Sequence, residues 1–371
     1  MNQISKSSIM KRKFPVFIFS ALLALGAASC SDDNNGDTPD PDMPENTLGV
    51  YVLNNGNMGK KIEGDITYYD YTERKAFQNI FQNANGRSLG NLPQCAVVYG
   101  SKMYVGVYES NTIEVIDRNT YKSIKQIPLA GRDASMPRGM VARDGKVYVS
   151  MYSGYVSRLD TLSLAIDKDV KVGPNPEKIA ILGNYLYVPN SDGMSWNTTG
   201  YGKTASRINL DTFSTAENFE VGLNPTKFVT DGSSLFLLCM GNYGDVPATV
   251  YRVDPSDLKS TEIGKFTLMA ADSNYLYLIN APYGVDRISY QKYNIATGAF
   301  SDMISDEGVE SPADIAVDPR TGNIFITSYV IENGYANYAI DGYAGIYDAS
   351  GANKGRFTTG VGPVLMFFSM R

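Results

Sequence analysis

The chain has 371 residues, a net charge of −6 and no histidine. The missing histidine excludes Ser-His-Asp and Cys-His catalytic arrangements and imidazole metal sites, and the acidic balance argues against nucleic acid and anionic lipid surfaces as partners. Three cysteines are too few for a disulfide scaffold, so we interpret Cys95 and Cys239 as small apolar residues, with reactive thiols as the alternative.

The first residues predict export. A basic cluster at residues 11–13 precedes an apolar run over residues 14–28, which is shorter than the roughly 20 apolar residues of a membrane-spanning helix. We predict a signal peptide over residues 1–29, with Met10 as a second candidate start. The small residues before Cys30 resemble a bacterial lipobox, which implies cleavage there and lipidation of Cys30. A secretory signal without lipidation is the alternative.

Residues 30–47 predict a flexible tether behind the lipidated cysteine. Six acidic residues and three prolines occupy residues 31–47, with almost no apolar side chain to bury. This acidic stretch also resembles the surface-export signals of Bacteroidota lipoproteins. Removal of residues 1–29, which hold four basic residues and no acidic residue, changes the net charge from −6 to −10.

A repeat dominates the rest of the chain. A turn followed by a short strand of aromatic and β-branched residues recurs with an average period of about 46 residues, which is typical of propeller blades. The seven copies lie at 49–55, 100–108, 144–152, 183–191, 231–240, 272–281 and 321–329. No segment shows sustained helical periodicity.

An apolar segment precedes six of the seven copies, and five of these segments begin with proline, which loses no ladder hydrogen bond at the start of a strand. A further such segment at residues 363–368 ends the chain, whereas the first copy has none before it. We therefore predict an all-β fold, a seven-bladed β-propeller over residues 48–371, in which the C-terminal strand closes the first blade.

Acidic or amide residues follow the third strand of each predicted blade. Such side chains cap turns by accepting bonds from backbone amides, so we interpret them as turn formers rather than metal ligands. They are Asp70, Asp117, Asp160, Asp211, Asp254, Asn294 and Asp348.

The long loops of the predicted propeller all leave from one face. The connections after the repeated strands, at 54–64, 189–203, 240–247, 280–287 and 329–341, are rich in aromatic, amide and glycine residues, as adaptable binding surfaces are. On this face we expect ligand contacts from loop and strand-end residues and from two arginine anchors, with ordinary solvated side chains as the alternative. The candidates are Asn55, Asn57, Met58, Tyr108, Arg132, Arg138, Tyr152, Trp196, Tyr201, Tyr243, Tyr283, Arg287, Tyr329 and Tyr335.

The innermost strands of a propeller surround a central funnel. Their first residues carry mixed charges, which we expect near the mouth of the funnel on the loop face. These residues are Gln94, Arg138, Glu177, Lys178, Thr226, Lys227 and Asp314. No phosphate-cradling motif accompanies them, because the glycine pairs of the chain lie outside any strand-to-helix context.

Several segments resemble one family. They are YVLNNGNMG (51–59), GDITYYD (64–70), NPEKIAILGNYLYVPNS (175–191), DIAVDPRTGNIFIT (314–327) and TTGVGP (358–363). They are similar to the YVTN-type, DUF5074-like propeller lipoproteins of Bacteroidota, some of which capture vitamin B12. The resemblance implies surface exposure on the outer membrane, a ligand bound on one face, and a TonB-dependent transporter as partner.

Three functions remain open from the sequence. We prefer capture of a bulky small molecule, with cobalamin or a related corrinoid as cargo rather than as a catalytic cofactor. Because histidine is absent, the protein cannot ligate cobalt through imidazole, so a corrinoid would be held through its ring and side chains. The alternatives are a protein- or glycan-binding propeller and a carboxylate-dependent lyase or hydrolase. We expect no catalysis and no resident metal.

Overall fold

The computed structural model describes residues 46–283 and 287–370. The predicted signal peptide, Cys30 and nearly all of the predicted tether lie outside these residues. Strand β1 begins at Thr47, one residue before the predicted start of the propeller. None of the helices in the described part of the chain is long and apolar enough to span a membrane.

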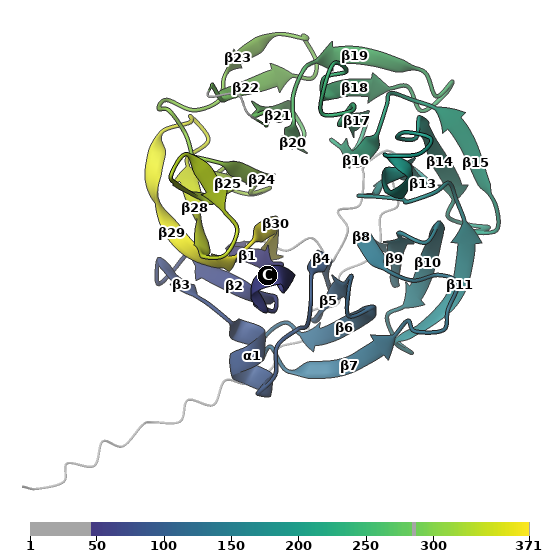
Figure 1. Cartoon of the computed structure of the whole chain (residues 1–371), viewed down its shortest axis with the longest axis horizontal. Helices are drawn as coiled ribbons and strands as arrows, with labels where there is room; N and C mark the ends of the chain where they lie inside the picture. The colour runs from purple at the N-terminus through teal and green to yellow at the C-terminus, as the bar shows by residue number, and fades with distance from the viewer. Residues whose placement is uncertain (1–45, 284–286, 371) are drawn as a thin grey trace, which may run out of the picture. The chain divides into compact units, whose positions relative to one another are not determined.

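Seven four-stranded antiparallel sheets follow one another around a ring (Figure 1). We name the strands of each blade A to D, from the innermost to the outermost. Blade 1 consists of β30 (Pro363–Met370), β1 (Thr47–Asn54), β2 (Asp65–Asp70) and β3 (Lys75–Phe77). The all-β fold and the seven-bladed propeller are thereby confirmed.

The other blades take their four strands in chain order. Blade 2 consists of β4 (Pro93–Tyr99), β5 (Lys102–Val107), β6 (Thr112–Asp117) and β7 (Ser123–Pro128). Blade 3 consists of β8 (Pro137–Arg143), β9 (Lys146–Met151), β10 (Tyr155–Asp160) and β11 (Ala165–Lys171). Blade 4 consists of β12 (Ala180–Leu182), β13 (Tyr185–Asn190), β14 (Thr204–Asn209) and β15 (Ala216–Glu220). Blade 5 consists of β16 (Pro225–Thr230), β17 (Leu235–Cys239), β18 (Thr249–Val253) and β19 (Ser260–Gly264). Blade 6 consists of β20 (Leu268–Ala271), β21 (Tyr275–Asn280), β22 (Ser289–Asn294) and β23 (Phe300–Asp302). Blade 7 consists of β24 (Pro312–Val317), β25 (Ile324–Ser328), β28 (Asp341–Tyr347) and β29 (Asn353–Val361). A hairpin of β26 (Val330–Glu332) and β27 (Tyr335–Asn337) is inserted in blade 7.

The C-terminal strand closes the ring, as the sequence predicts. Strand β30 pairs antiparallel with β1, and Tyr51 lies opposite Phe367 with their ring centres 5.2 Å apart. Figure 1 shows the two ends of the described chain side by side in blade 1. This pairing covers the inner edge of β1, so blade 1 is as complete as the other six.

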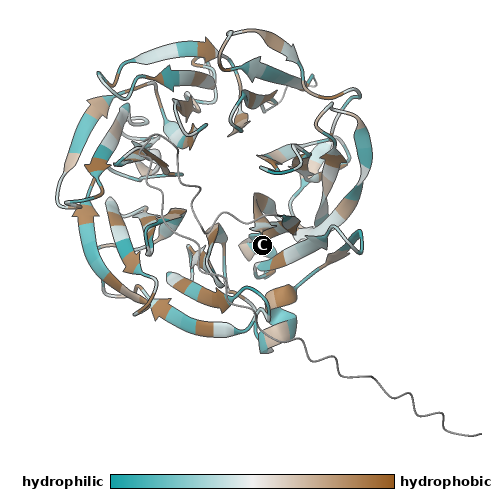
Figure 2. Ribbon diagram, turned by 180° about the vertical axis from the view of Figure 1, so that it is seen from behind, coloured by the Kyte–Doolittle hydropathy of each residue, from teal (hydrophilic) through white to brown (hydrophobic). Residues whose placement is uncertain are grey.

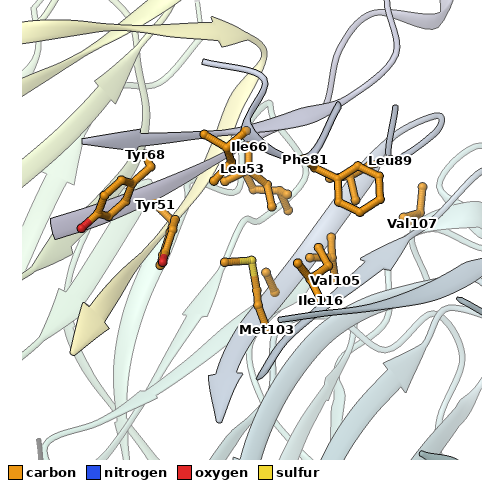
Figure 3. Packing of buried hydrophobic residues seen from close by; sticks show 12 residues of the cluster. Tyr51, Leu53, Ile66, Tyr68, Phe81, Leu89, Met103, Val105, Val107 and Ile116 are labelled. Atoms are coloured by element: carbon orange, nitrogen blue, oxygen red, sulfur yellow. The ribbon is translucent and has the colours of Figure 1, made fainter. Parts of the chain in front are cut away.

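The core lies between the blades. Within the described residues there is one apolar cluster for each of the seven contacts between neighbouring blades. Along β5, Met103 and Val105 face blade 1 while Tyr104 faces blade 3. Because both faces of a B strand are buried in this way, its sequence is continuously apolar rather than alternating. Figure 3 shows the cluster between blades 1 and 2, and Figure 2 shows hydrophilic residues recurring along the outermost strands.

A short helix in blade 1 was not predicted. Helix α1 (Ile80–Asn85) connects β3 to β4 and buries Ile80 and Phe81 against blade 2. The carboxylate of Asp65 accepts hydrogen bonds from the amides of Phe81 at 3.1 Å and Gln82 at 3.0 Å. The buried Asp65 thus satisfies amides of the first helical turn, which a six-residue helix cannot bond internally.

The turn-forming role of the regularly spaced acids is confirmed at six of seven positions. Asp117 Oδ1, for example, accepts from the amides of Asn119 at 3.1 Å and Thr120 at 2.8 Å. The prediction was wrong for Asp211, because Asn209 performs this role in blade 4, accepting from the amides of Asp211 and Thr212. Among the residues that the structure describes, no group of three acidic or cysteine side chains could hold a metal ion.

Candidate binding face

Strand order places the B–C loops and the D–A connections on one side of the propeller, which we call the loop face. Five B–C loops are long, over residues 55–64, 191–203, 240–248, 281–288 and 329–340, whereas those of blades 2 and 3 are short turns. The A–B and C–D turns of the opposite side have six residues at most. The predicted asymmetry between the two sides is therefore present in the structure.

Exposed apolar side chains concentrate on the loop face. Of the thirteen large apolar residues that are exposed in the described part of the chain, nine lie in B–C loops. These nine are Met58, Met194, Trp196, Tyr243, Val246, Tyr283, Ile331, Tyr335 and Tyr338. Exposed apolar groups cost solvation free energy, and their clustering on one face is typical of a contact surface.

A central cavity of about 460 Å³ opens on this face at the inner ends of the A strands. All seven residues predicted for the mouth of the funnel line it, so that prediction is confirmed. Side chains from three B–C regions complete the wall, namely Tyr152, Tyr201 and Tyr243. Four of the fourteen predicted ligand contacts, these tyrosines and Arg138, are thus brought together around one cavity.

Arg138 is held in the central cavity by an ion pair and by two aromatic rings. Its guanidinium donates two hydrogen bonds to Glu177, from Nε at 2.8 Å and from Nη2 at 3.3 Å. The guanidinium carbon also lies 5.1 Å from the ring centre of Tyr152 and 5.7 Å from that of Tyr108. Burial lowers the pKa of Arg138, but the charge and hydrogen bonds of Glu177 outweigh this effect and raise the pKa overall. The arginine is therefore a fixed cation held against two aromatic rings.

Lys227 and Asp314 form a second charged pair in the central cavity. The ammonium of Lys227 lies 3.6 Å from Asp314 Oδ1 and donates to the carbonyl of Met269 at 2.9 Å. Asp314 Oδ2 accepts from the amide of Met366 on the closing strand at 2.9 Å. Burial lowers the pKa of Lys227, and the neighbouring charge of Lys178 lowers it further, against the opposing effect of Asp314.

Aromatic pairs stiffen the loops around the cavity. The rings of Tyr201 and Tyr243 are 5.9 Å apart, and those of Tyr329 and Tyr338 are 4.6 Å apart. Asn57 donates to the carbonyl of Tyr338 at 2.7 Å, which ties the loops of blades 1 and 7 together. Edge-to-face aromatic contacts and amide bonds of this kind restrict the positions that the rings can adopt.

The remaining candidates lie on the loop face but not around the central cavity. Trp196 is 63% exposed and follows the short 3-10 helix η2 (Gly193–Ser195). Tyr335 belongs to the β26–β27 hairpin, Asn55 bonds to Gly362 through its backbone amide, and Tyr283 and Arg287 are exposed. Arg132 does not act as an anchor of the cavity, because it pairs with Asp169 on the outermost strand β11 at 2.7 Å.

A second, wider hollow was not predicted. It measures about 870 Å³ and is lined by Met58 together with residues around helix α1 and strand β2, including Asp65, Gln82 and Arg87. Arg87 is anchored there by a 2.8 Å ion pair with the buried Glu114 of blade 2. The only sequence signal for this hollow is the polar stretch of residues 78–91, which reads as an ordinary connection.

The two cysteines of the propeller are buried in different blades, Cys95 in β4 of blade 2 and Cys239 in β17 of blade 5. Burial raises the pKa of both thiols to about 12. Since the thiolate is the reactive form, both behave as small apolar residues at neutral pH, as the sequence interpretation holds.

Comparison with known proteins supports the fold and part of the resemblance. Hydrazine synthase of Kuenenia stuttgartiensis is similar over 78% of this chain and 96% of its own, with a TM-score of 0.52 and 16% identity, which shows the fold alone. A computationally designed protein, Ika8, matches over 71% of this chain and 86% of its own with a TM-score of 0.46 and 11% identity. No curated protein sequence matches the chain. Residues 48–223, which begin in strand β1 and extend through blade 4, match the model of the family described as "Domain of unknown function (DUF5074)".

Proposed function

We propose that this propeller is a binding protein that captures a bulky small molecule on its loop face, with cobalamin or a related corrinoid as the preferred cargo. The observation that carries the proposal is the concentration of exposed apolar side chains on the face where a polar central cavity opens. A corrinoid combines apolar ring faces with an amide-rich rim, and the loop face combines exposed rings with amide and charged groups. Such a ligand would lie across the loops, because the central cavity is too small to enclose it.

We further propose that Cys30 carries a lipid anchor at the outer membrane, on the cell surface, and that the cargo passes to a TonB-dependent transporter. The lipobox-like sequence before Cys30 and the acidic stretch after it support this placement. Metabolic labelling with palmitate tests it: label is expected in the wild-type protein and absent from a Cys30→Ser variant. Label retained by Cys30→Ser would contradict the assignment of the anchor.

The single tryptophan offers a direct test of cargo binding. The chain without residues 1–29, carrying Cys30→Ser, is titrated with cobalamin while Trp196 emission is followed. We expect strong, saturable quenching, because the corrin ring absorbs in the emission range and Trp196 is exposed on the loop face. Unchanged emission together with no heat in calorimetric titration would reject corrinoid capture.

Two matched variants locate the binding side. Tyr243→Asn removes an exposed ring from the central cavity and keeps a residue type that tolerates the positive φ of 57° at this position. Leu162→Ala removes an apolar side chain, 91% exposed, from a turn on the opposite side. Tyr243→Asn should weaken cobalamin binding roughly tenfold, as loss of a buried aromatic contact does, and Leu162→Ala should leave it unchanged.

A macromolecular partner is the second candidate, and the β26–β27 hairpin favours it. This hairpin presents Ile331 and Tyr335, and the loop that follows presents Tyr338, beyond the blade that carries them. Flat surfaces with exposed tyrosines are typical of protein and glycan recognition. Pull-down of an outer-membrane receptor or retention on a glycan array, without any response to corrinoids, would support this candidate instead.

We propose that the protein performs no chemistry on its ligand. Both carboxylates of the central cavity are engaged, Glu177 by Arg138 and Asp314 by Lys227 and the Met366 amide. A general acid or base must be free to exchange a proton with the substrate. Turnover of a lactone or glycan panel, lost on substitution of either carboxylate, would overturn this proposal.

A further inference from the structure

More positive than negative side chains line the wall of the central cavity. Five charged side chains line it, the cations Arg138, Lys178 and Lys227 and the carboxylates Glu177 and Asp314. The complete chain is acidic, with a net charge of −6, so a local excess of positive charge does not follow from composition. The cavity therefore attracts anions on an otherwise acidic molecule.

The two carboxylates are already occupied. Both oxygens of Glu177 accept from the Arg138 guanidinium, at 2.8 and 3.3 Å. Asp314 accepts from the Met366 amide at 2.9 Å and lies 3.6 Å from the Lys227 ammonium. Neither carboxylate is left to neutralise a third cation.

Lys178 is that third cation. Its backbone is fixed between blades 4 and 5, since its amide donates to the carbonyl of Thr226 at 3.1 Å and its carbonyl accepts from the amide of Phe228 at 2.9 Å. Throughout residues 46–283 and 287–370, its ammonium has no hydrogen bond or ion pair. A lysine ammonium has three donors, so the group faces the central cavity with unused bonding capacity.

Lys178 also lies beside a second lysine. Residue 178, two residues before strand β12, forms an isolated parallel bridge with residue 227 of β16, and the charge of Lys178 disfavours the charged form of Lys227. A bound anion would relieve this repulsion as well as use the free donors. The Gln94 side chain, which lines the same wall, adds an amide donor suited to oxyanion oxygens.

We propose that the central cavity is a subsite for a compact oxyanion, a phosphate or carboxylate group, bound by Lys178. The inference deepens the proposed function, on which it rests for the cargo: the captured molecule carries an acidic group that enters the cavity while its apolar part covers the loops. Corrinoids supply a matched pair for this question, because cobalamin has a phosphodiester in its nucleotide loop and cobinamide does not.

The first experiment uses free anions and no cargo. Inorganic phosphate and acetate are titrated calorimetrically into the chain without residues 1–29 carrying Cys30→Ser, with chloride keeping the ionic strength constant. We expect saturable binding of at least one of them, weakened roughly tenfold or more by Lys178→Gln, because a charged hydrogen bond is lost. Lys178→Arg should retain binding, and Lys203→Gln, which removes an exposed lysine from a loop of the same face, should not alter it.

The outcomes separate the two proposals. Absence of binding by both anions, or equal binding by wild type and Lys178→Gln, overturns the subsite whatever cobalamin does. Anion binding that depends on Lys178, with neither quenching of Trp196 nor heat on addition of cobalamin, supports the subsite and rejects corrinoid capture. If both proposals hold, Lys178→Gln should weaken cobalamin binding and leave cobinamide binding unchanged. An equal loss for the two corrinoids would overturn the phosphodiester as the group that enters the cavity.

Discussion

Replacement of Arg138 by methionine tests whether the arginine of the central cavity stabilises the ring. The Glu177 side chain is 9% exposed and that of Arg138 28%. Loss of one partner from a buried ion pair costs about 3–5 kcal/mol, because the other charge is left without compensation. Partial exposure of the guanidinium reduces this to about 2 kcal/mol, and loss of its contacts with two tyrosine rings adds about 1 kcal/mol. We therefore expect Arg138→Met to lower the free energy of unfolding by about 3 kcal/mol.

Urea titration followed by circular dichroism measures this loss, and a double-mutant cycle isolates the ion pair. Glu177→Gln removes the buried charge, so the double variant Arg138→Met/Glu177→Gln should recover about 2 kcal/mol of the loss. Lys259→Met is the control, since its pair with Asp257 is on the surface and should make no measurable difference. A change below about 0.5 kcal/mol for Arg138→Met, or strict additivity in the cycle, would refute the reasoning.

Three further predictions concern packing and titration. Gly173→Ala should lower the free energy of unfolding by about 1–3 kcal/mol in urea titration, because the added Cβ would lie 2.6 Å from Asn190 Cγ. Gly59→Ala is the control and should change this free energy little, because its Cβ would meet only one atom, at 3.4 Å. Cys95 and Cys239 should resist a thiol reagent at pH 8 in the folded protein and react once urea unfolds it. Rapid labelling of either thiol without urea would contradict their burial. Burial raises the pKa of four tyrosines from 10 to about 12, so the unfolded chain loses these protons first. Stability that is intact below pH 10 should therefore fall as the pH rises towards 12, and a free energy of unfolding that stays constant between pH 10 and 12 in urea titration would show this to be wrong. These four are Tyr68, Tyr104, Tyr290 and Tyr329.

The propeller was predictable because its blades repeat both in sequence and in physical environment. Every B strand is buried on both faces, so each copy keeps the same apolar, β-branched composition, and a proline at Pro137 or Pro312 marks the start of an A strand. The closure could be inferred because one A strand is missing at the start and one is left over at the end. The pairing of β30 with β1 follows from this count of strands rather than from any single motif, whereas their register comes from the structure.

The features that escaped prediction depend on contacts between blades or on very short elements. Arg132 pairs with Asp169, a residue of the next blade's outermost strand, and the spacing of the two in sequence contains no signal for the contact. Helix α1 has six residues, fewer than two turns, so its apolar residues cannot show a helical period. Asn209 replaces Asp211 in the blade 4 turn because the amide oxygen of asparagine accepts the same backbone bonds as a carboxylate.

The residues that stabilise the ring differ from those that we propose to bind the ligand, so binding can be altered without loss of the fold. The seven apolar clusters lie between blades, and the exposed rings of Trp196, Tyr243 and Tyr335 belong to none of them. Exposed apolar groups of this kind contribute little to the stability of the fold, so a rigid scaffold can vary them freely. Lys178 fits the same pattern, because its backbone belongs to the ring while its ammonium is unused by it. Substitutions at these positions should therefore alter ligand binding and leave the unfolding transition in place, whereas Arg138, which belongs to both, should change the two together.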